Sequence, residues 1–288
     1  MPELLRSVQH ILKAEDTLEG AGVRLKRAFG NGEVPLFDPF LLLDNFGSTN
    51  PRDYVAGFPW HPHRGIETVT YMLEGQVDHE DSLGNKGRID SGDVQWMTSG
   101  SGILHQEMPQ RKEGEFQGFQ LWVNIPSKLK MAEPAYRGLS GRDIPSIRND
   151  SGTVKVVAGT HQGVEGPVKG IPVDPTYLDV ALRPDAAFEL PVKKGHTVFS
   201  YVVDGGAKFE GRDGLVPAKR VVLLGDGDTV RLRAGAEGAR LLLVSGRPLH
   251  EPVAWYGPIV MNTQEQLSQA MSELRHGTFI KAREIREG

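Results

Sequence analysis

The sequence predicts an all-β protein with one short helix near its C-terminus. It contains 35 glycines and 19 prolines among 288 residues, a share that favours many turns over long helices. Short runs of Val, Leu, Ile, Tyr and Phe recur about every 8–12 residues and are bounded by Gly, Pro, Asn and Asp. A single stretch carries helical spacing. This pattern is typical of a β-sandwich or β-barrel.

The predicted strands follow these apolar runs in order. They include residues 40–47, 67–75, 154–160, 197–206, 220–234 and 239–246. Residues 81–87 (DSLGNKG) predict a hairpin connection between two strands, because Asp, Asn and Gly accept the backbone conformations of tight turns.

The predicted helix begins at a capping box, with Thr263 at the cap and Gln266 three residues later. Apolar residues then follow at helical spacing, at Leu267, Ala270, Met271 and Leu274, and Gly277 provides the stop. We expect a surface helix that packs one apolar face on a sheet.

Composition excludes several classes of function. There are no cysteines, so disulfides, thiolate metal sites, iron–sulfur clusters and a cysteine nucleophile are excluded. The net charge of −4 gives no general attraction to nucleic acid or to anionic membranes. No apolar stretch approaches a membrane span, and charges interrupt the N-terminus before a signal-peptide core could form. We expect a cytoplasmic protein, or a nuclear one in a eukaryotic cell, that binds neither nucleic acid nor membranes directly.

Two segments of the chain are similar to each other. Residues 68–75 and 198–205 are both strands that end in an acid–glycine turn, and a Gly-Asp pair follows each about 20 residues later. The pattern favours a duplicated β unit over a chance likeness. The boundary is expected in the polar, Pro- and Gly-rich stretch 126–150. We therefore predict two domains, residues 1–135 and 136–288.

Histidine spacing identifies a candidate metal site. His61 and His63 form an H-x-H pair, and His105 and Glu107 form an H-x-E pair. Residues i and i+2 of a strand point to the same face. A lone pair of this kind is more often structural, but the strand–turn–strand between the two pairs would return the chain and bring them side by side. The four side chains would then face one point.

Three imidazoles, one carboxylate and no sulfur make a borderline-hard ligand set. It suits Fe(II), Mn(II), Ni(II), Co(II) or Cu(II), and Zn(II) would also bind. A six-coordinate ion with these four ligands keeps two positions for water, substrate or dioxygen. Such a site favours redox or Lewis-acid chemistry over a structural role.

The motifs around these residues resemble those of a known family. The first is Gly57-x3-His61-x-His63-x3-Glu67-x7-Gly75, and the second is Gly92-Asp93-x6-Ser99-Gly100-x-Gly102-x2-His105. Together they resemble the two cupin motifs. The chain most resembles the pirin family of bicupins, through residues 23–29, 38–44, 61–71, 81–87, 96–107 and 256–263.

The resemblance implies two tandem cupin β-barrels of jelly-roll type, with one divalent metal per chain in the N-terminal barrel. The expected ion is Fe(II), with Mn, Ni, Co, Cu or Zn as alternatives. Its implied ligands are His61, His63, His105 and Glu107. Glu67 stands where many other cupins place a carboxylate ligand, and we expect it to orient a histidine instead. In the C-terminal copy Pro191 and Lys193 take the places of His61 and His63, so that barrel is expected to bind no metal.

The resemblance also implies a function. Several pirins resemble quercetin 2,3-dioxygenases, so we expect a metal-dependent dioxygenase that cleaves flavonols with O2, with Glu107 as ligand and catalytic base. Four side chains are candidates to line an aromatic pocket, namely Phe46, Trp60, Trp96 and Met97. His79 and Asp81 form another same-face pair, which we interpret as structural because it flanks the hairpin.

Two alternatives to catalysis remain. Pirins also resemble iron-dependent, redox-sensitive regulators that bind other proteins, as transcription co-regulators or partners of metabolic enzymes. Loss of turnover on changing Glu107 would favour the enzyme, and unchanged binding of a protein partner would favour the regulator. A third reading is a vestigial metal in a protein that acts on another small molecule.

Overall fold

The chain forms two compact units, and the computed structural model describes residues 4–281. The first unit consists of Asp16–Val34, Phe40–Arg142 and the segment from His250 onward. The second consists of Asp143–Leu249, Pro35–Pro39 and the segment ending at Glu15. The predicted single division after residue 135 is therefore corrected. Strand pairing places an N-terminal strand in the second unit, and a C-terminal hairpin and helix belong to the first.

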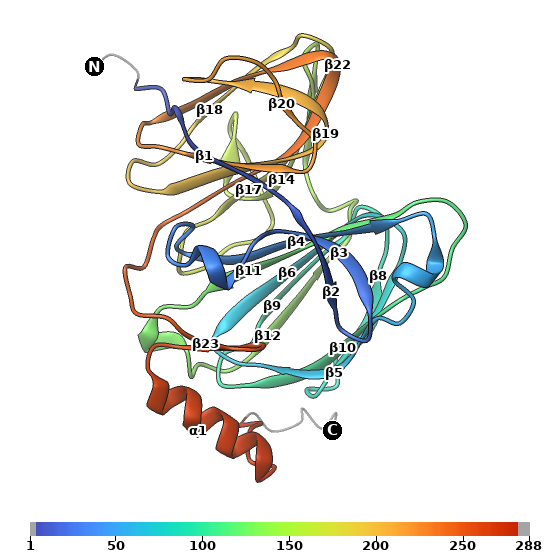
Figure 1. Ribbon diagram of the computed structural model, residues 1–288, viewed down its shortest axis with the longest axis vertical. Coiled ribbons are helices and arrows are strands. Elements are labelled where there is room, and N and C mark those ends of the chain that lie inside the picture. The colour runs from blue at the N-terminus through green and yellow to red at the C-terminus, as the bar shows by residue number, and fades with distance from the viewer. Residues whose placement is uncertain (1–3, 282–288) are drawn as a thin grey trace. The chain divides into compact units, whose positions relative to one another are not determined.

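Two antiparallel sheets build the first unit (Figure 1). A seven-stranded sheet has the order β12-β9-β6-β11-β4-β3-β2, and a four-stranded sheet has the order β5-β10-β7-β8. The bounds are β2 Glu15–Glu19, β3 Val23–Phe29, β4 Phe40–Ser48, β5 Phe58–His63, β6 Ile66–Glu74, β7 Val77–Asp81, β8 Lys86–Ile89, β9 Val94–Thr98, β10 Ile103–Pro109, β11 Phe116–Asn124 and β12 Ala135–Leu139. Short 3-10 helices lie at Asn31–Glu33, Pro51–Asp53 and Ser127–Leu129.

The second unit is built on a nine-stranded antiparallel sheet. Its main path is β1-β21-β19-β22-β17-β14-β13, with β18 paired to β22 and β20 paired to β19. The bounds are β1 Val8–Lys13, β13 Ser146–Asn149, β14 Gly152–Ala158, β17 Thr176–Leu182, β18 Ala187–Pro191, β19 Thr197–Phe209, β20 Val216–Pro217, β21 Arg220–Leu224 and β22 Thr229–Gly246. A separate two-stranded sheet joins β15 Thr160–His161 to β16 Val164–Glu165.

The apolar runs of the sequence become strands, with changes of boundaries at two places. Residues 154–160 are divided between β14, which ends at Ala158, and β15, which begins at Thr160. Residues 220–234 are not one strand, because β21 ends at Leu224 and β22 begins at Thr229. β22 then continues through residue 246, so the separate strand expected at 239–246 is its second half. The hairpin predicted at 81–87 is confirmed by the antiparallel pairing of β7 with β8.

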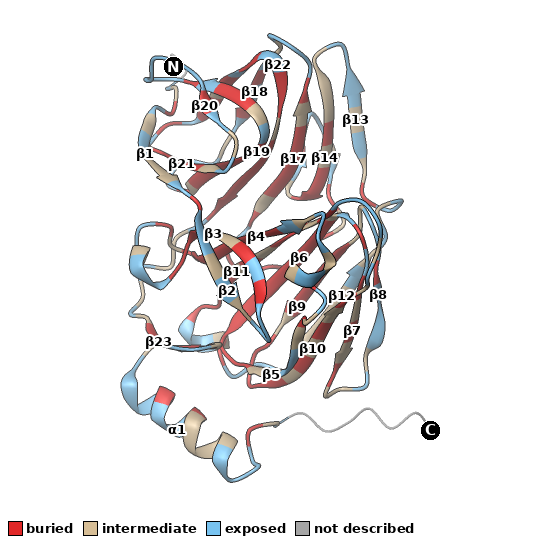
Figure 2. Ribbon diagram, turned by 45° about the vertical axis from the view of Figure 1, so that its right-hand side comes forward, coloured by how far each residue is buried: buried red, intermediate tan, exposed pale blue. Residues whose placement is uncertain are grey.

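Each unit has its own apolar core (Figure 2). In the first unit one cluster contains Val23, Leu25, Phe46, Tyr54, Met72, Val77, Ile89 and Phe116. In the second unit the cluster draws on most strands of the nine-stranded sheet, including Val156, Leu178, Val198, Val230 and Leu241. Alternation of side chains along each strand sends these residues to one face.

Helix α1 (Gln264–Arg275) has the predicted capping box, in which Thr263 accepts a hydrogen bond from the backbone of Gln266. Leu267 and Ala270 are buried in a cluster with the hairpin formed by β23 (Ala254–Tyr256) and β24 (Ile259–Met261). The helix therefore packs on a two-stranded hairpin. Among residues 4–281, no helix has the length and apolar character needed to cross a membrane.

Candidate metal centre

Three histidines converge where β5 and β10 pair. The antiparallel register places His105 opposite His61, and His63 is on the same face as His61 because it is two residues further along β5. In the described part of the chain, one ring nitrogen from each of these three histidines lies within 4.8 Å of the other two. The expectation that the two sequence pairs lie side by side is confirmed by this register.

The orientation of two rings shows which nitrogen faces the centre. His61 Nδ1 lies 2.9 Å from the carbonyl oxygen of Pro59, and His63 Nδ1 lies 3.1 Å from that of Pro258. A carbonyl oxygen only accepts, so each Nδ1 carries the proton and each Nε2 presents a lone pair. The two Nε2 atoms are 3.1 Å apart. Two lone pairs at that distance repel, and a cation between them would relieve the repulsion.

Burial keeps the imidazoles neutral. It lowers the pKa of His61, and it lowers the pKa of His63 and His105 well below the usual value, with the neighbouring imidazoles adding to the effect. Both ring nitrogens of His105 are buried without a hydrogen-bond partner among the described residues. Neutral imidazoles with an unused lone pair are the form that binds transition metals. These residues therefore fit a divalent metal ion.

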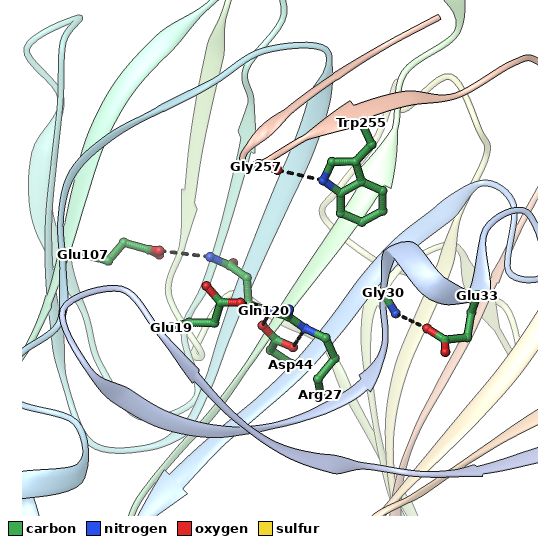
Figure 3. A network of polar contacts seen from close by, with 9 residues as sticks. All are labelled: Glu19, Arg27, Gly30, Glu33, Asp44, Glu107, Gln120, Trp255 and Gly257. Atoms are coloured by element: carbon green, nitrogen blue, oxygen red, sulfur yellow. Dashed lines mark hydrogen bonds and ion pairs between the residues drawn. The ribbon is translucent and has the colours of Figure 1, made fainter. Parts of the chain in front are cut away.

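Glu107 lies two residues beyond His105 on β10, after an irregularity in the pairing with β5 that places it opposite Phe58. Its carboxylate accepts a hydrogen bond from Thr70 Oγ1 at 2.7 Å. It accepts a second from Gln120 Nε2 at 3.0 Å (Figure 3). Burial raises the pKa of Glu107, and the two hydrogen bonds oppose that effect. Glu107 is not part of the close group of three imidazoles, and its role as a fourth ligand stays a prediction.

The hydrogen bond from Thr70 to Glu107 can be tested by its effect on metal affinity. We expect Thr70→Val to lower metal affinity by about 10- to 100-fold, because partners that orient a ligand have effects of that size. Chelator competition against the metal-loaded protein measures the change. Thr68→Val is the matched control, since the hydroxyl of Thr68 is also buried on β6 but has no hydrogen-bond partner in the described chain. Equal losses in both variants would contradict this role for Thr70.

Of the expectations for the acidic residues Glu67 and Asp81, the first is wrong and the second is confirmed. Glu67 does not orient a histidine through the contacts seen. Its carboxylate accepts hydrogen bonds from Trp96 Nε1 at 2.8 Å and Thr98 Oγ1 at 2.9 Å, which lie on the neighbouring strand. Asp81 is structural as expected, because it accepts the backbone N–H groups of Leu83 and Asn85 and so closes the hairpin turn.

His79 lies closer to the centre than the structural interpretation implies. It faces Glu107 across the β7–β10 pairing, and its ring centroid lies 5.5 Å from that of His105. The His79 ring stacks on Tyr136 at 5.1 Å, and burial lowers its pKa to about 4. The period-two spacing of β7 contained this signal, because His79 and Asp81 share a face.

His61 and His63 border a cavity of about 560 Å³, which Glu107 also lines. Phe46 lines it as expected, whereas Trp96 and Met97 are fully buried away from it and Trp60 is 47% exposed. Sequence reasoning missed Phe58, Trp122 and Trp255, which do line the cavity. The spacing of Gln120 and Trp122 on β11 was a usable signal, because the two share a face.

A polar row crosses the floor of this cavity. Arg27, Asp44, Gln120 and Thr70 occupy directly opposed positions on β3, β4, β11 and β6. Opposed residues in an antiparallel sheet point to the same face. Figure 3 shows three members of this row, Arg27, Asp44 and Gln120, together with the Glu107 carboxylate.

The turn after His63 is held by the C-terminal hairpin. Lys130 Nζ donates to the carbonyl oxygens of Gly65 at 2.8 Å and Val260 at 3.0 Å, and to Asn124 Oδ1 at 2.7 Å. Burial lowers the pKa of Lys130 to about 7. Gly65 has φ of +78°, and a Cβ there would lie 2.0 Å from the Val260 carbonyl oxygen. This position therefore requires glycine.

Comparison with known proteins agrees with this architecture. The family model described as pirin matches residues 22–123, and the model of the pirin C-terminal cupin domain matches residues 177–280. A pirin-like protein of Caulobacter vibrioides is 48% identical over 277 residues, covering 96% of this chain and 99% of that protein. Pirin of Homo sapiens is 42% identical over 263 residues, covering 90% of this chain and 88% of that protein.

A solved structure is similar over nearly the whole chain. It is a quercetin 2,3-dioxygenase from Acinetobacter baumannii, 32% identical, with a TM-score of 0.89 and coverage of 96% of this chain and 98% of that chain. The family matches lie on both units of the fold. The chain is a member of the pirin family and contains two cupin domains.

Proposed function

We propose that this chain is a metal-dependent dioxygenase that cleaves flavonols such as quercetin with O2. One divalent transition metal, with Fe(II) as the first candidate, would be held by His61, His63, His105 and Glu107. The observation that carries the proposal is the convergence of neutral imidazoles at the wall of a cavity lined by aromatic and aliphatic side chains. The likeness to a quercetin 2,3-dioxygenase supports the reaction class.

When bound, the metal would supply Lewis-acid and redox chemistry to a chelating substrate. The protein supplies the rest. Carbonyl groups fix the tautomers of His61 and His63. Thr70 and Gln120 hold the Glu107 carboxylate, which can accept the proton of a flavonol hydroxyl. His105 is fully buried and Glu107 is 4% exposed, so these two side chains have little contact with bulk water.

Oxygen uptake tests the proposal. Protein loaded with Fe(II) without oxygen, mixed with quercetin and then given O2, should consume about one O2 per flavonol, because a dioxygenase places both atoms in its product. Metal-free protein is the control. A fully loaded protein that consumes no oxygen would contradict the proposal and leave the redox-sensitive regulator as the function to test.

Replacing Glu107 separates catalysis from metal binding. We expect Glu107→Gln to reduce turnover by about 10²- to 10⁴-fold, the range seen for general acid–base groups, while elemental analysis still finds metal on the three imidazoles. Glu80→Gln is the matched control. Glu80 lies on the neighbouring strand β7 next to Gln106, outside the cavity lining. Unchanged turnover in Glu107→Gln would show that Glu107 is not the base.

A further inference from the structure

Arg27, Asp44 and Glu19 form an ion-pair triad that lines the cavity beyond Gln120 (Figure 3). Arg27 Nε and Nη2 donate to the two oxygens of Asp44 at 2.8 and 2.7 Å. Arg27 Nη1 pairs with Glu19 Oε1 at 2.9 Å. Adjacent strands are about 5 Å apart, so Asp44 lies one strand and Arg27 two strands from Gln120. If a ligand in the cavity has one end at Glu107, the triad therefore faces its opposite end.

The charge of the triad selects against anions. One guanidinium and two carboxylates give a net charge of −1, and each guanidinium nitrogen already contacts a carboxylate. The imidazoles at the other end are neutral. Each carboxylate has about four lone-pair sites, so Asp44 and Glu19 can accept further O–H donors. Burial raises the pKa of Asp44 to about 6 and Arg27 opposes this, so Asp44 is ionised at pH 8.

Between the two ends the walls are apolar and aromatic. Leu25, Leu42 and Phe46 line the cavity, together with Trp122 and Trp255, whose ring centroids are 5.7 Å apart. Trp122 also meets the His63 ring edge-on at 5.2 Å. Such walls suit a flat ring system. A volume of about 560 Å³ is within the usual range for a small-molecule ligand.

We propose that Asp44 and Glu19, held in place by Arg27, are specificity-determining residues that select a neutral, polyhydroxylated aromatic ligand by accepting O–H donors at its end remote from the histidines. This proposal rests on the proposed function, which assigns the other end of the ligand to the metal. It adds that the peripheral hydroxyls, and not only the chelating pair, decide which ligand binds.

Two ligands test it by direct binding. Quercetin has peripheral hydroxyls, whereas 3-hydroxyflavone keeps the chelating oxygens and lacks every other hydroxyl. With Zn(II)-loaded protein at pH 8 and without oxygen, calorimetry should give wild-type protein at least a tenfold preference for quercetin, since hydrogen bonds to charged groups have effects of that size. In Asp44→Asn the preference should fall about tenfold, with 3-hydroxyflavone affinity little changed.

The controls separate recognition from folding. Asp179→Asn is matched, because Arg240 holds Asp179 in the same two-bond geometry, at 3.0 and 2.7 Å, in the second unit. It should keep the wild-type preference. If Asp44→Asn does not fold, Glu19→Gln serves instead, because the Glu19 side chain is 40% exposed, and it should lower the preference several-fold.

The outcomes distinguish the two proposals. Equal affinity of wild-type protein for both flavonols, with turnover of quercetin retained, would overturn the role of Asp44 and Glu19 and leave the proposed function standing. A preference that survives in both Asp44→Asn and Glu19→Gln would do the same. Failure of both flavonols to bind metal-loaded protein would overturn both proposals.

Discussion

Replacing His105 with alanine is expected to reduce metal affinity by at least about 100-fold. His105 is fully buried, and its ring lies 4.3 Å from that of His61 and 5.0 Å from that of His63, centroid to centroid. Removal of one ligand should exceed the 10- to 100-fold effect of removing a residue that only orients a ligand. Elemental analysis after dialysis against a chelator measures retention, and calorimetric titration gives the affinity.

His161→Ala is the control for this variant. His161 is also buried, with Nδ1 lacking a hydrogen-bond partner among the described residues, but it belongs to the second unit. It should retain about one metal ion per chain. Metal should also raise the melting temperature of wild-type protein and of His161→Ala but not of His105→Ala, because an ion stabilises only the state that binds it. Equal retention in both variants would refute the three-histidine centre.

The second large effect, a loss of folding stability, is expected on replacing Arg64. Its side chain is 2% exposed and pairs with Glu273 of α1 at 2.7 Å. It also donates to the carbonyl oxygen of Phe279 at 2.8 Å and lies 4.2 Å from the centroid of that ring. Arg64→Met should lower the free energy of unfolding by about 1–3 kcal/mol, because the carbonyl oxygen of Phe279 loses its buried donor, whereas Glu273 keeps Lys281 as a partner at 3.0 Å. Urea denaturation measures this loss.

The position of Arg64 links this loss to the site. It directly follows His63, whose Nδ1 pairs with the carbonyl of Pro258 in the hairpin that α1 covers. Metal affinity should therefore fall about tenfold in Arg64→Met, and hydrogen exchange should increase in the C-terminal hairpin and helix. Arg275→Met, an exposed change on the same helix, is the control. A change within about 0.5 kcal/mol of wild type in Arg64→Met would be that of an ordinary surface substitution and would contradict this account.

Local patterns predicted the strands and the histidine cluster because a strand has a fixed period of two. His61 and His63 must share a face, and the turn at 81–87 returns the chain, so β10 can pair with β5. The capping box at Thr263 is equally local, and it is present. These features depend on residues close together in sequence or on one return of the chain.

The features that the sequence did not predict depend on contacts between distant segments of the chain. Trp122 and Trp255 meet because a C-terminal hairpin packs near β11, and no periodicity encodes that approach. Glu67 bonds Trp96 and Thr98 because β9 lies beside β6, so the expected contact with a histidine does not form. The division of the chain also escaped local reasoning, since β1 pairs with β21 across more than half the sequence.

The contribution of the segment after His250 to the first unit has a consequence for biosynthesis. A ribosome delivers His61, His63 and His105 long before it delivers Pro258, Val260 and Glu273, which fix the turn beside His63. The nascent chain therefore lacks the support of its imidazoles until Pro258, Val260 and Glu273 have been made and have docked. We expect the ion to be acquired only after that docking.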